Sequence, residues 1–367
     1  MRVALAVAVL IAAACAPRPS SAADPMAPQQ WTPIPAPAAP LTVPVSLFEL
    51  TYSDGADLHR AVVDAATLAR VTDTALGRAD GVHPIVGTAS VIVDDNDGVA
   101  VVNGLGERHR YAPPVAPLPI GGISSGGTIY IGKLDGIAVA DADGNVLRSF
   151  DAPRAKPGVP AVRPGSKGRF FPNGSWVQAF AFDDVGSFVI VQSPANSAVV
   201  DLDRTERADL LGLMVLDVTT TAGRAYLLGR DTTVIDGGYN LVELDLATLA
   251  TVRTARFAVT QPAGALDHMR VLVTPRRDVY AYVAVQVNDG KVPIRSELVA
   301  FDSAFAPSRI ALPNDLGLDA TVGADGALYL FGGPARNVVT RVDPLTRDLT
   351  RYAVAPDGTF VRTLVAR

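Results

Sequence analysis

The sequence has almost no cysteine: Cys15 is the only one in 367 residues. A single cysteine excludes an intramolecular disulfide framework. Charged residues are also scarce, at 19% against 49% apolar residues, which excludes long disorder or a coiled coil for most of the chain. The 32 basic residues are outnumbered by 37 acidic ones, and this balance argues against a nucleic-acid binder.

Motifs that carry chemistry are equally few. The four histidines have no H-x-x-x-H or H-x-H spacing, so no metal site is predicted; they are His59, His83, His109 and His268. The run Gly122–Gly126 fits G-x-S-x-G, but that nucleophile motif requires a following helix, and here the next residues read as a strand. The sequence therefore predicts no catalytic residue and no cofactor.

No apolar run is long enough to span a bilayer. The run from Val3 to Ala14 is twelve residues long. As a helix it covers about 18 Å, against a hydrocarbon core of about 30 Å. Because Arg2 precedes it, the run is typical of a signal peptide.

The signal-like run ends in Ile-Ala-Ala-Ala-Cys15, which resembles a bacterial lipobox. The resemblance implies cleavage before Cys15 and acylation of its thiol by diacylglycerol and a fatty acid such as palmitate. We therefore expect residues 1–14 to be a lipoprotein signal peptide and Cys15 to be a membrane anchor on the extracytoplasmic side of the cell membrane. The alternative is a plain secretory signal that is cut at a later site, such as Ser21-Ala22-Ala23.

Residues 15–44 are predicted to be a linker, because nine prolines stand among alanine, serine and glutamine. Proline removes backbone donors and favours extended polyproline II, so this segment cannot form a packed core. At about 3.1 Å per residue it could reach about 90 Å. The remaining residues, 45–367, are expected to form the folded domain.

Residues 45–367 contain a weak internal repeat. The octapeptides DAATLARV at 64–71 and DLATLATV at 245–252 agree at six of eight positions, and each follows an apolar run. Similar apolar runs end in an Asp or Asn that begins a turn, as these side chains favour. Those markers are Asp64, Asn103, Asp141, Asp201, Asp245, Asp302 and Asp343.

The repeat predicts an all-β fold. Units of about 40–46 residues with short strands indicate a seven-bladed β-propeller of four-stranded blades, with six or eight blades as the alternative. The first unit lacks one strand, and Thr359–Ala366 is left over at the end. We therefore expect the terminal strand to complete the first blade and close the ring. The architecture resembles the broad class of surface-layer and quinoprotein-like propellers.

One insertion interrupts the repeat at 151–175. It is basic in an otherwise acidic protein, and aromatic residues lie at its end. Connections between blades lie on the face that usually binds ligands in the resembled class, so we expect a recognition site there, with Arg230 and His268 as further members. The predicted binding residues of the insertion are Arg163, Lys167, Arg169, Phe170, Phe171 and, directly after it, Trp176.

These features favour a membrane-anchored binding or scaffolding propeller with a monomeric head. Its partner would be an envelope protein or an anionic polymer. The alternative is an extracytoplasmic enzyme, such as a lactonase or a quinone-cofactor dehydrogenase, which would need polar residues gathered at the channel mouth. Candidates for such a cluster are His83, Lys133, Arg230, His268, Arg295 and Arg336. A sensor or assembly factor is a third possibility.

Overall fold

In the computed structural model of this chain, residues 44–367 are described apart from several gaps. The gaps are 56, 79–80, 85–90, 96–97, 103–107, 111–116, 125–126, 134–135, 142–144, 152–175, 194, 234–237, 260–264, 288–293 and 334–335. The predictions on residues 1–43 therefore lie outside the described residues. Within the described part of the chain, no helix has the length and hydropathy of a membrane span.

The described residues form 28 strands in seven four-stranded antiparallel sheets. One sheet joins both ends of the chain, in the order β28 (Phe360–Ala366), β1 (Leu47–Asp54), β2 (Asp57–Asp64) and β3 (Arg70–Arg78). Each of the other six uses four consecutive strands. Three of these contain β4 (Gly81–Pro84), β5 (Val91–Asp95), β6 (Gly98–Val102) and β7 (Arg108–Arg110); β8 (Pro117–Ile123), β9 (Ile129–Lys133), β10 (Gly136–Ala140) and β11 (Val146–Asp151); and β12 (Trp176–Asp183), β13 (Gly186–Gln192), β14 (Asn196–Asp201) and β15 (Arg207–Leu211).

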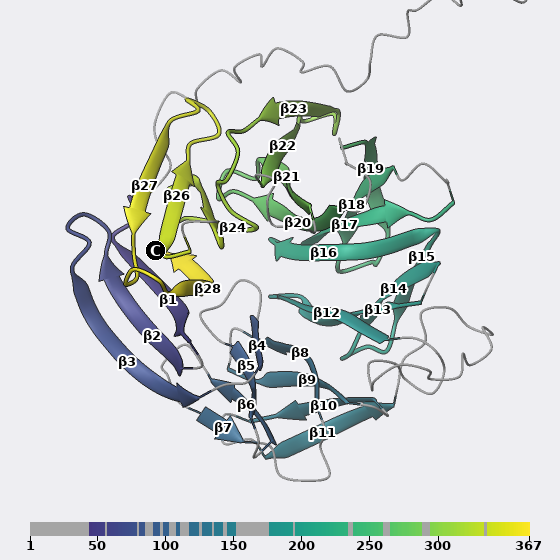
Figure 1. Cartoon of the computed structure of the whole chain (residues 1–367). Helices are drawn as coiled ribbons and strands as arrows, with labels where there is room; N and C mark the ends of the chain where they lie inside the picture. The colour runs from purple at the N-terminus through teal and green to yellow at the C-terminus, as the bar shows by residue number, and fades with distance from the viewer. Residues whose placement is uncertain are drawn as a thin grey trace, which may run out of the picture.

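The remaining three sheets complete the chain. They contain β16 (Leu213–Thr221), β17 (Arg224–Asp231), β18 (Tyr239–Asp245) and β19 (Thr251–Phe257); β20 (Ala265–Val273), β21 (Val279–Val287), β22 (Arg295–Phe301) and β23 (Pro307–Ala311); and β24 (Asp319–Val322), β25 (Leu328–Phe331), β26 (Val338–Val342) and β27 (Leu349–Ala353). The sheets stand around a central axis as the blades of a propeller, and the first strand of each sheet, with β28 as first in the closing sheet, faces that axis (Figure 1).

The predicted length of the repeat unit was wrong, because the sheets differ in length. We expected units of about 40–46 residues, but the sheets range from Gly81–Arg110 to Ala265–Ala311. In Figure 1 the short β4–β7 sheet partly overlaps the β8–β11 sheet, so the ring can be read as six-bladed in that view, whereas strand pairing separates the two. The unit length varies because hairpins and connections can lengthen without disturbing the inner strands.

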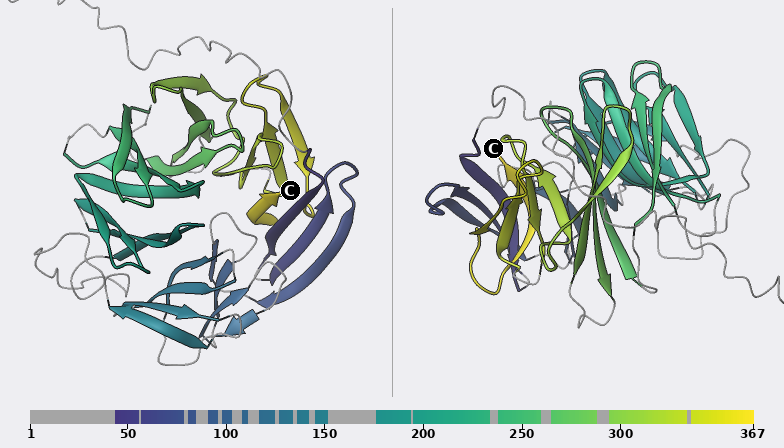
Figure 2. Two further views of the ribbon diagram at one scale, coloured as in Figure 1. Left: turned by 180° about the vertical axis from the view of Figure 1, so that it is seen from behind. Right: turned by 90° about the horizontal axis from the view of Figure 1, so that it is seen from above.

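The ring has two distinct faces, and its strands run between them (Figure 2). We call one the connection face, because the first strand of each sheet begins there and the last strand ends there. The other is the amino-terminal face: Pro44 lies on it, and the first and third strands of each sheet end there. The C-terminus also lies there, because the Arg367 carbonyl accepts the Ser46 and Leu47 N–H groups at 2.6 and 2.9 Å.

The predicted Asp markers lie at one equivalent position, where the third strand of a sheet ends. Asp64 accepts the Thr67 N–H at 2.7 Å, and Asp245 accepts the Thr248 N–H at 2.9 Å. Hydrogen bonds from Thr67 and from Thr248 lower the pKa of the two aspartates. Each marker thus supplies the acceptor that its turn needs, which explains why Asp recurs where a strand ends.

Apolar side chains gather between neighbouring sheets. Phe48 and Leu50 of β1 pack with Tyr329 of β25 on one side of the closing sheet. On its other side, Leu58 of β2 packs with Val91 of β5. Each buried side chain of this size contributes about 1.5–3 kcal/mol, so the blades are held mainly by the interfaces between them.

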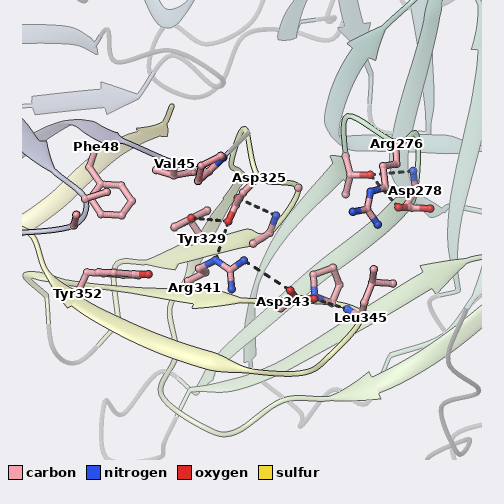
Figure 3. Close-up of a pocket in the computed structure, with 17 residues that line it drawn as sticks. Val45, Phe48, Arg276, Asp278, Asp325, Tyr329, Arg341, Asp343, Leu345 and Tyr352 are labelled. Carbon is pink, nitrogen blue, oxygen red and sulfur yellow. Dashed lines mark hydrogen bonds and ion pairs between the residues drawn. The ribbon is translucent and has the colours of Figure 1, made fainter. Parts of the chain in front are cut away.

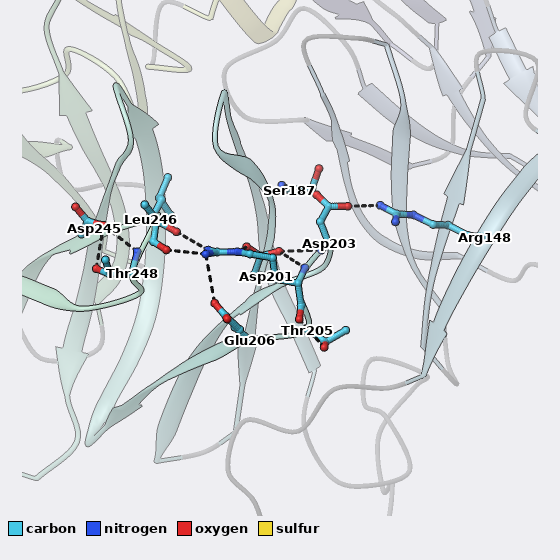
Figure 4. A network of polar contacts seen from close by, with 11 residues as sticks. Arg148, Ser187, Asp201, Asp203, Thr205, Glu206, Asp245, Leu246 and Thr248 are labelled. Atoms are coloured by element: carbon cyan, nitrogen blue, oxygen red, sulfur yellow. Dashed lines mark hydrogen bonds and ion pairs between the residues drawn. The ribbon is translucent and has the colours of Figure 1, made fainter.

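Polar contacts also link neighbouring sheets at the amino-terminal face (Figure 4). Arg148 of β11 pairs with Asp203 at 2.7 Å. Arg204 pairs with Asp201 at 2.7 Å and also donates to the Leu246 carbonyl of the next sheet at 2.9 Å. One turn, between β14 and β15, is thereby tied to both neighbouring sheets.

The two ends of the chain form one sheet, as the sequence predicted. Strand β28 pairs with β1 from Phe48 opposite Ala366 to Ser53 opposite Phe360. The pairing includes a buried contact of 2.8 Å between the Thr51 and Thr363 hydroxyls. Without β28, the inner edge of β1 would be open.

Candidate functional site

A cavity of about 240 Å³ lies on the central axis between four neighbouring inner strands. Each strand contributes one charged side chain to its wall. These are Asp217 of β16, Arg270 of β20, Asp319 of β24 and Arg362 of β28. Because strands alternate their side chains between two faces, each of these residues can reach the cavity from its own strand.

Arg270 holds two carboxylates. Its Nε and Nη2 donate to the Oδ1 and Oδ2 of Asp319 at 2.6 and 2.9 Å, and its Nη1 lies 3.6 Å from Oδ1 of Asp217. The other oxygen of Asp217 accepts the Val271 N–H at 2.8 Å. A forked contact of this kind fixes the orientation of both groups, so Arg270 joins three adjacent blades at the channel.

The electrostatics of Arg270 and Asp217 differ. Burial raises the pKa of Asp217 to about 6, against the opposing effect of Arg270. Burial disfavours the charge of Arg270, but Asp319 and Asp217 outweigh it and raise the pKa of the guanidinium. Asp217 is therefore the group in this cluster that can change protonation near neutral pH.

Arg362 is in a different environment. Its guanidinium lies 4.4 Å from the ring centroid of Phe360, and that of Arg336 lies 5.7 Å from the same centroid. Arg362 donates to the Ser53 hydroxyl at 3.0 Å. Among the described carboxylates, none forms an ion pair with either arginine. Burial and the nearby charge of Arg336 lower the pKa of Arg362, so the pair carries positive charge that these carboxylates leave unneutralised.

Three of the predicted binding residues are described, and they do not form one site. His268 is exposed and lines a small cavity with Arg270. Trp176 donates to the Gln178 side chain at 3.2 Å, at the start of inner strand β12. Arg230 lies on β17 and donates to the Tyr239 hydroxyl at 3.3 Å within its own sheet.

Other predicted residues cannot be compared with the structure. The basic insertion begins after β11 and ends at β12, so its two ends lie on the connection face. Its predicted binding residues lie outside the described residues: Arg163, Lys167, Arg169, Phe170 and Phe171. The side chains of the enzyme candidates His83 and Lys133 also lie outside them.

The sequence analysis missed most of the channel charges. Asp217 and Asp319 are each the only charge of their strand, and Arg270 follows Asp267 and His268 in β20, so nothing along the chain links the three. A charge inside a run such as LMVLDVTT is the signal that could have found them, because a buried charge requires a partner. Across the described part of the chain, no three His, Cys, Asp or Glu residues are arranged to hold a metal ion.

No protein-family model and no curated protein matches the chain. Solved structures match it at low identity. It is similar to Citrobacter koseri AztD at 14% identity, a TM-score of 0.41, and coverage of 88% of this chain and 98% of that one. Kuenenia stuttgartiensis hydrazine synthase matches at 15% identity and a TM-score of 0.41, covering 84% of this chain and 80% of that one. The Neurospora crassa Pan2 WD40 domain matches at 12% identity and 0.42, covering 82% and 90%. These are likenesses of fold alone, and the chain is an all-β propeller.

The variant Asp217→Asn is expected to change how stability depends on pH. Burial raises the folded pKa of Asp217 from 3.8 to about 6, so the folded state holds the proton more tightly than the unfolded chain. That stabilisation is complete below about pH 3.8 and is lost as the pH rises through about 6. The unfolding free energy of Asp217→Asn relative to wild type should therefore rise by roughly 1–3 kcal/mol as the pH increases from about 4 to about 7.

Urea unfolding of both proteins across this pH range measures the effect. Asp184→Asn removes an exposed carboxylate from the β12–β13 turn and serves as the matched control. A constant stability difference between wild type and Asp217→Asn over the whole range would contradict the assignment.

Proposed function

We propose that this chain is a non-enzymatic binding or scaffolding propeller whose connection face takes an acidic group of an envelope protein. The unneutralised pair Arg336 and Arg362 is the observation that carries the proposal. Both guanidinium groups lie over one aromatic ring, Phe360, at 5.7 and 4.4 Å from its centroid. An incoming carboxylate would relieve the repulsion between them and form charge-assisted hydrogen bonds.

The proposal includes a lipid anchor on Cys15 and residence on the extracytoplasmic side of the membrane. The direction in which the chain enters the ring supports this arrangement. Pro44 lies on the amino-terminal face, whereas Arg336 and the ends of the basic insertion, Asp151 and Trp176, lie on the opposite face. A tether ending at Pro44 would leave the connection face accessible to partners.

The charged side chains at the channel, Asp217, Arg270 and Asp319, bear on the alternative that the chain is an enzyme. Polar groups do gather there, and Asp217 has a pKa near neutrality, at about 6. However, both carboxylates already contact Arg270, at 2.6 Å for Asp319 and 3.6 Å for Asp217. A base that is held in this way is less able to accept a substrate proton, so binding is favoured over catalysis.

The variant Cys15→Ser tests the anchor. Serine has no thiol to form a thioether with a diacylglyceryl group, so the protein should remain unprocessed or leave the membrane fraction. Fractionation of cells followed by intact-mass measurement of the protein distinguishes these outcomes from wild type. A variant that matured and stayed in the membrane like wild type would contradict the lipid anchor.

The double variant Arg336→Gln, Arg362→Gln tests the partner surface. It should reduce cross-linking to an acidic envelope protein in intact cells at least five-fold, because the pair supplies the charge contact. The double variant should still fold. Burial and the charge of Arg336 already disfavour the charged form of Arg362, so removing that charge should not destabilise the folded state. Wild-type capture should also weaken as salt is added.

Arg351→Gln is the control, because Arg351 is an exposed arginine on the outer strand β27. The single variant Arg336→Gln, at an exposed position, covers the case in which the double variant is unstable. Capture that is equal in all of these proteins, at low and physiological salt, would count against the proposed surface.

A further inference from the structure

A second and larger cavity, of about 530 Å³, opens on the amino-terminal face (Figure 3). Its wall comes from the start of β1, from the turn between β20 and β21, and from the sheet β24–β27. Phe48 and Tyr352 lie on one side of it, and Arg276 and Asp278 on the other (Figure 3). Its volume is within the range of small-molecule sites, about 300–1,000 Å³.

One wall of the cavity is aromatic. The rings of Phe48 and Tyr352 have centroids 5.2 Å apart, and Tyr329 meets Phe48 edge-on at 5.6 Å. The apolar side chains of Val45 and Leu345 also line the cavity, and Leu345 lies on the side of Asp343 (Figure 3). An aromatic wall favours a ligand with C–H groups on one side, because the face of an aromatic ring is electron-rich.

The rest of the lining presents hydrogen-bond donors and acceptors. Arg341 lies between Asp325, at 2.8 Å, and Asp343, at 3.7 Å. The Tyr329 hydroxyl donates to Asp325 at 3.1 Å, and the Thr274 hydroxyl donates to Asp278 at 3.2 Å. The carboxylates therefore already have partners but keep free lone pairs.

Two buried donors near the cavity lack an acceptor, and only the one on Arg276 belongs to a residue of its lining. Arg276 lines the cavity, and its buried Nε has no hydrogen-bond partner. The hydroxyl of Tyr280, a residue only 1% exposed, has none either. Burial raises the pKa of Tyr280, with further contributions from Asp278 and Asp343, so its hydroxyl stays protonated. An unmet buried donor is costly, and a ligand oxygen beside Arg276 would relieve that cost.

The mixture of positive and negative side chains in the cavity makes a simple ion a poor ligand for it. Two arginines, Arg276 and Arg341, face three aspartates, Asp278, Asp325 and Asp343. A strong anion would meet the three carboxylates, and a simple cation would meet the unpaired guanidinium of Arg276. A neutral ligand whose hydroxyl groups both donate and accept satisfies both kinds of group.

We propose that this cavity binds a neutral saccharide unit, with its C–H face against Phe48, Tyr329 and Tyr352 and its hydroxyl groups toward Arg276 and the aspartates. The site lies on the opposite face from Arg336 and Arg362 and does not rest on the acidic partner proposed above. Because Val45 is part of its wall, the saccharide would bind beside the point where the chain enters the ring.

Saturation-transfer NMR with neutral sugars tests the proposal. The probes are glucose, galactose, mannose and N-acetylglucosamine, with their disaccharides, and acetate and choline represent a simple anion and a simple cation. At least one neutral sugar should receive saturation, most strongly at its ring C–H protons. The variant Arg276→Met should weaken its binding at least ten-fold, because it removes the unpaired donor and keeps the apolar stem.

Arg277→Met is the matched control, since Arg277 is the exposed neighbour in the same turn and does not line the cavity. Tyr352→Leu should also weaken binding, because it removes a ring from the aromatic wall. Circular dichroism and melting temperature verify the fold of each variant. Binding of acetate or choline in place of the sugars, no sugar binding at millimolar concentration, or equal binding by Arg276→Met and Arg277→Met would each overturn the proposal.

Discussion

The pairing of β28 with β1 is the contact on which the rest of the structure depends. It joins residues at opposite ends of the folded domain, such as Thr51 and Thr363, whose hydroxyls are 2.8 Å apart. Both candidate sites include residues of this sheet: β28 carries Arg362 at the channel, and β1 carries Phe48 in the wall of the larger cavity. Closing the ring therefore removes an open edge and also creates the surfaces that could bind ligands.

The inner strands carry two arginines, Arg270 and Arg362, whose charges have different surroundings. Arg270 is held by Asp217 and Asp319, so its buried charge is offset and it ties three blades together. Arg362, two inner strands further along the ring from Arg270, contacts the Ser53 hydroxyl and the Phe360 ring instead. A neutralised guanidinium is well suited to a structural role, whereas the positive charge of Arg362, which no described carboxylate offsets, is the basis of the partner site that we propose.

Much of the fold could be predicted from the sequence, because its signals are local. Alternating apolar residues indicate strands, and Asp64 and Asp245 mark equivalent turns through their own hydrogen bonds to nearby N–H groups. Unit length could not be predicted, because hairpin length is independent of the inner strand. The sites were mostly missed: Asp217 and Asp319 lie a hundred residues apart in sequence and meet only through Arg270. Of the described predicted residues, His268 lies beside Arg270, whereas Trp176 and Arg230 have other neighbours.

Hydrogen exchange of the intact protein tests the central claim, that the two chain ends form one sheet, most directly. Amides of 47–54 and 360–366 should be protected together and open with the same free energy, because each strand supplies the partners of the other. In Leu364→Ala, which truncates a buried side chain of β28, that opening free energy should fall by about 2–5 kcal/mol in both segments while 239–245 stays protected. Rapid exchange of 360–366 beside a protected 47–54 would contradict the account.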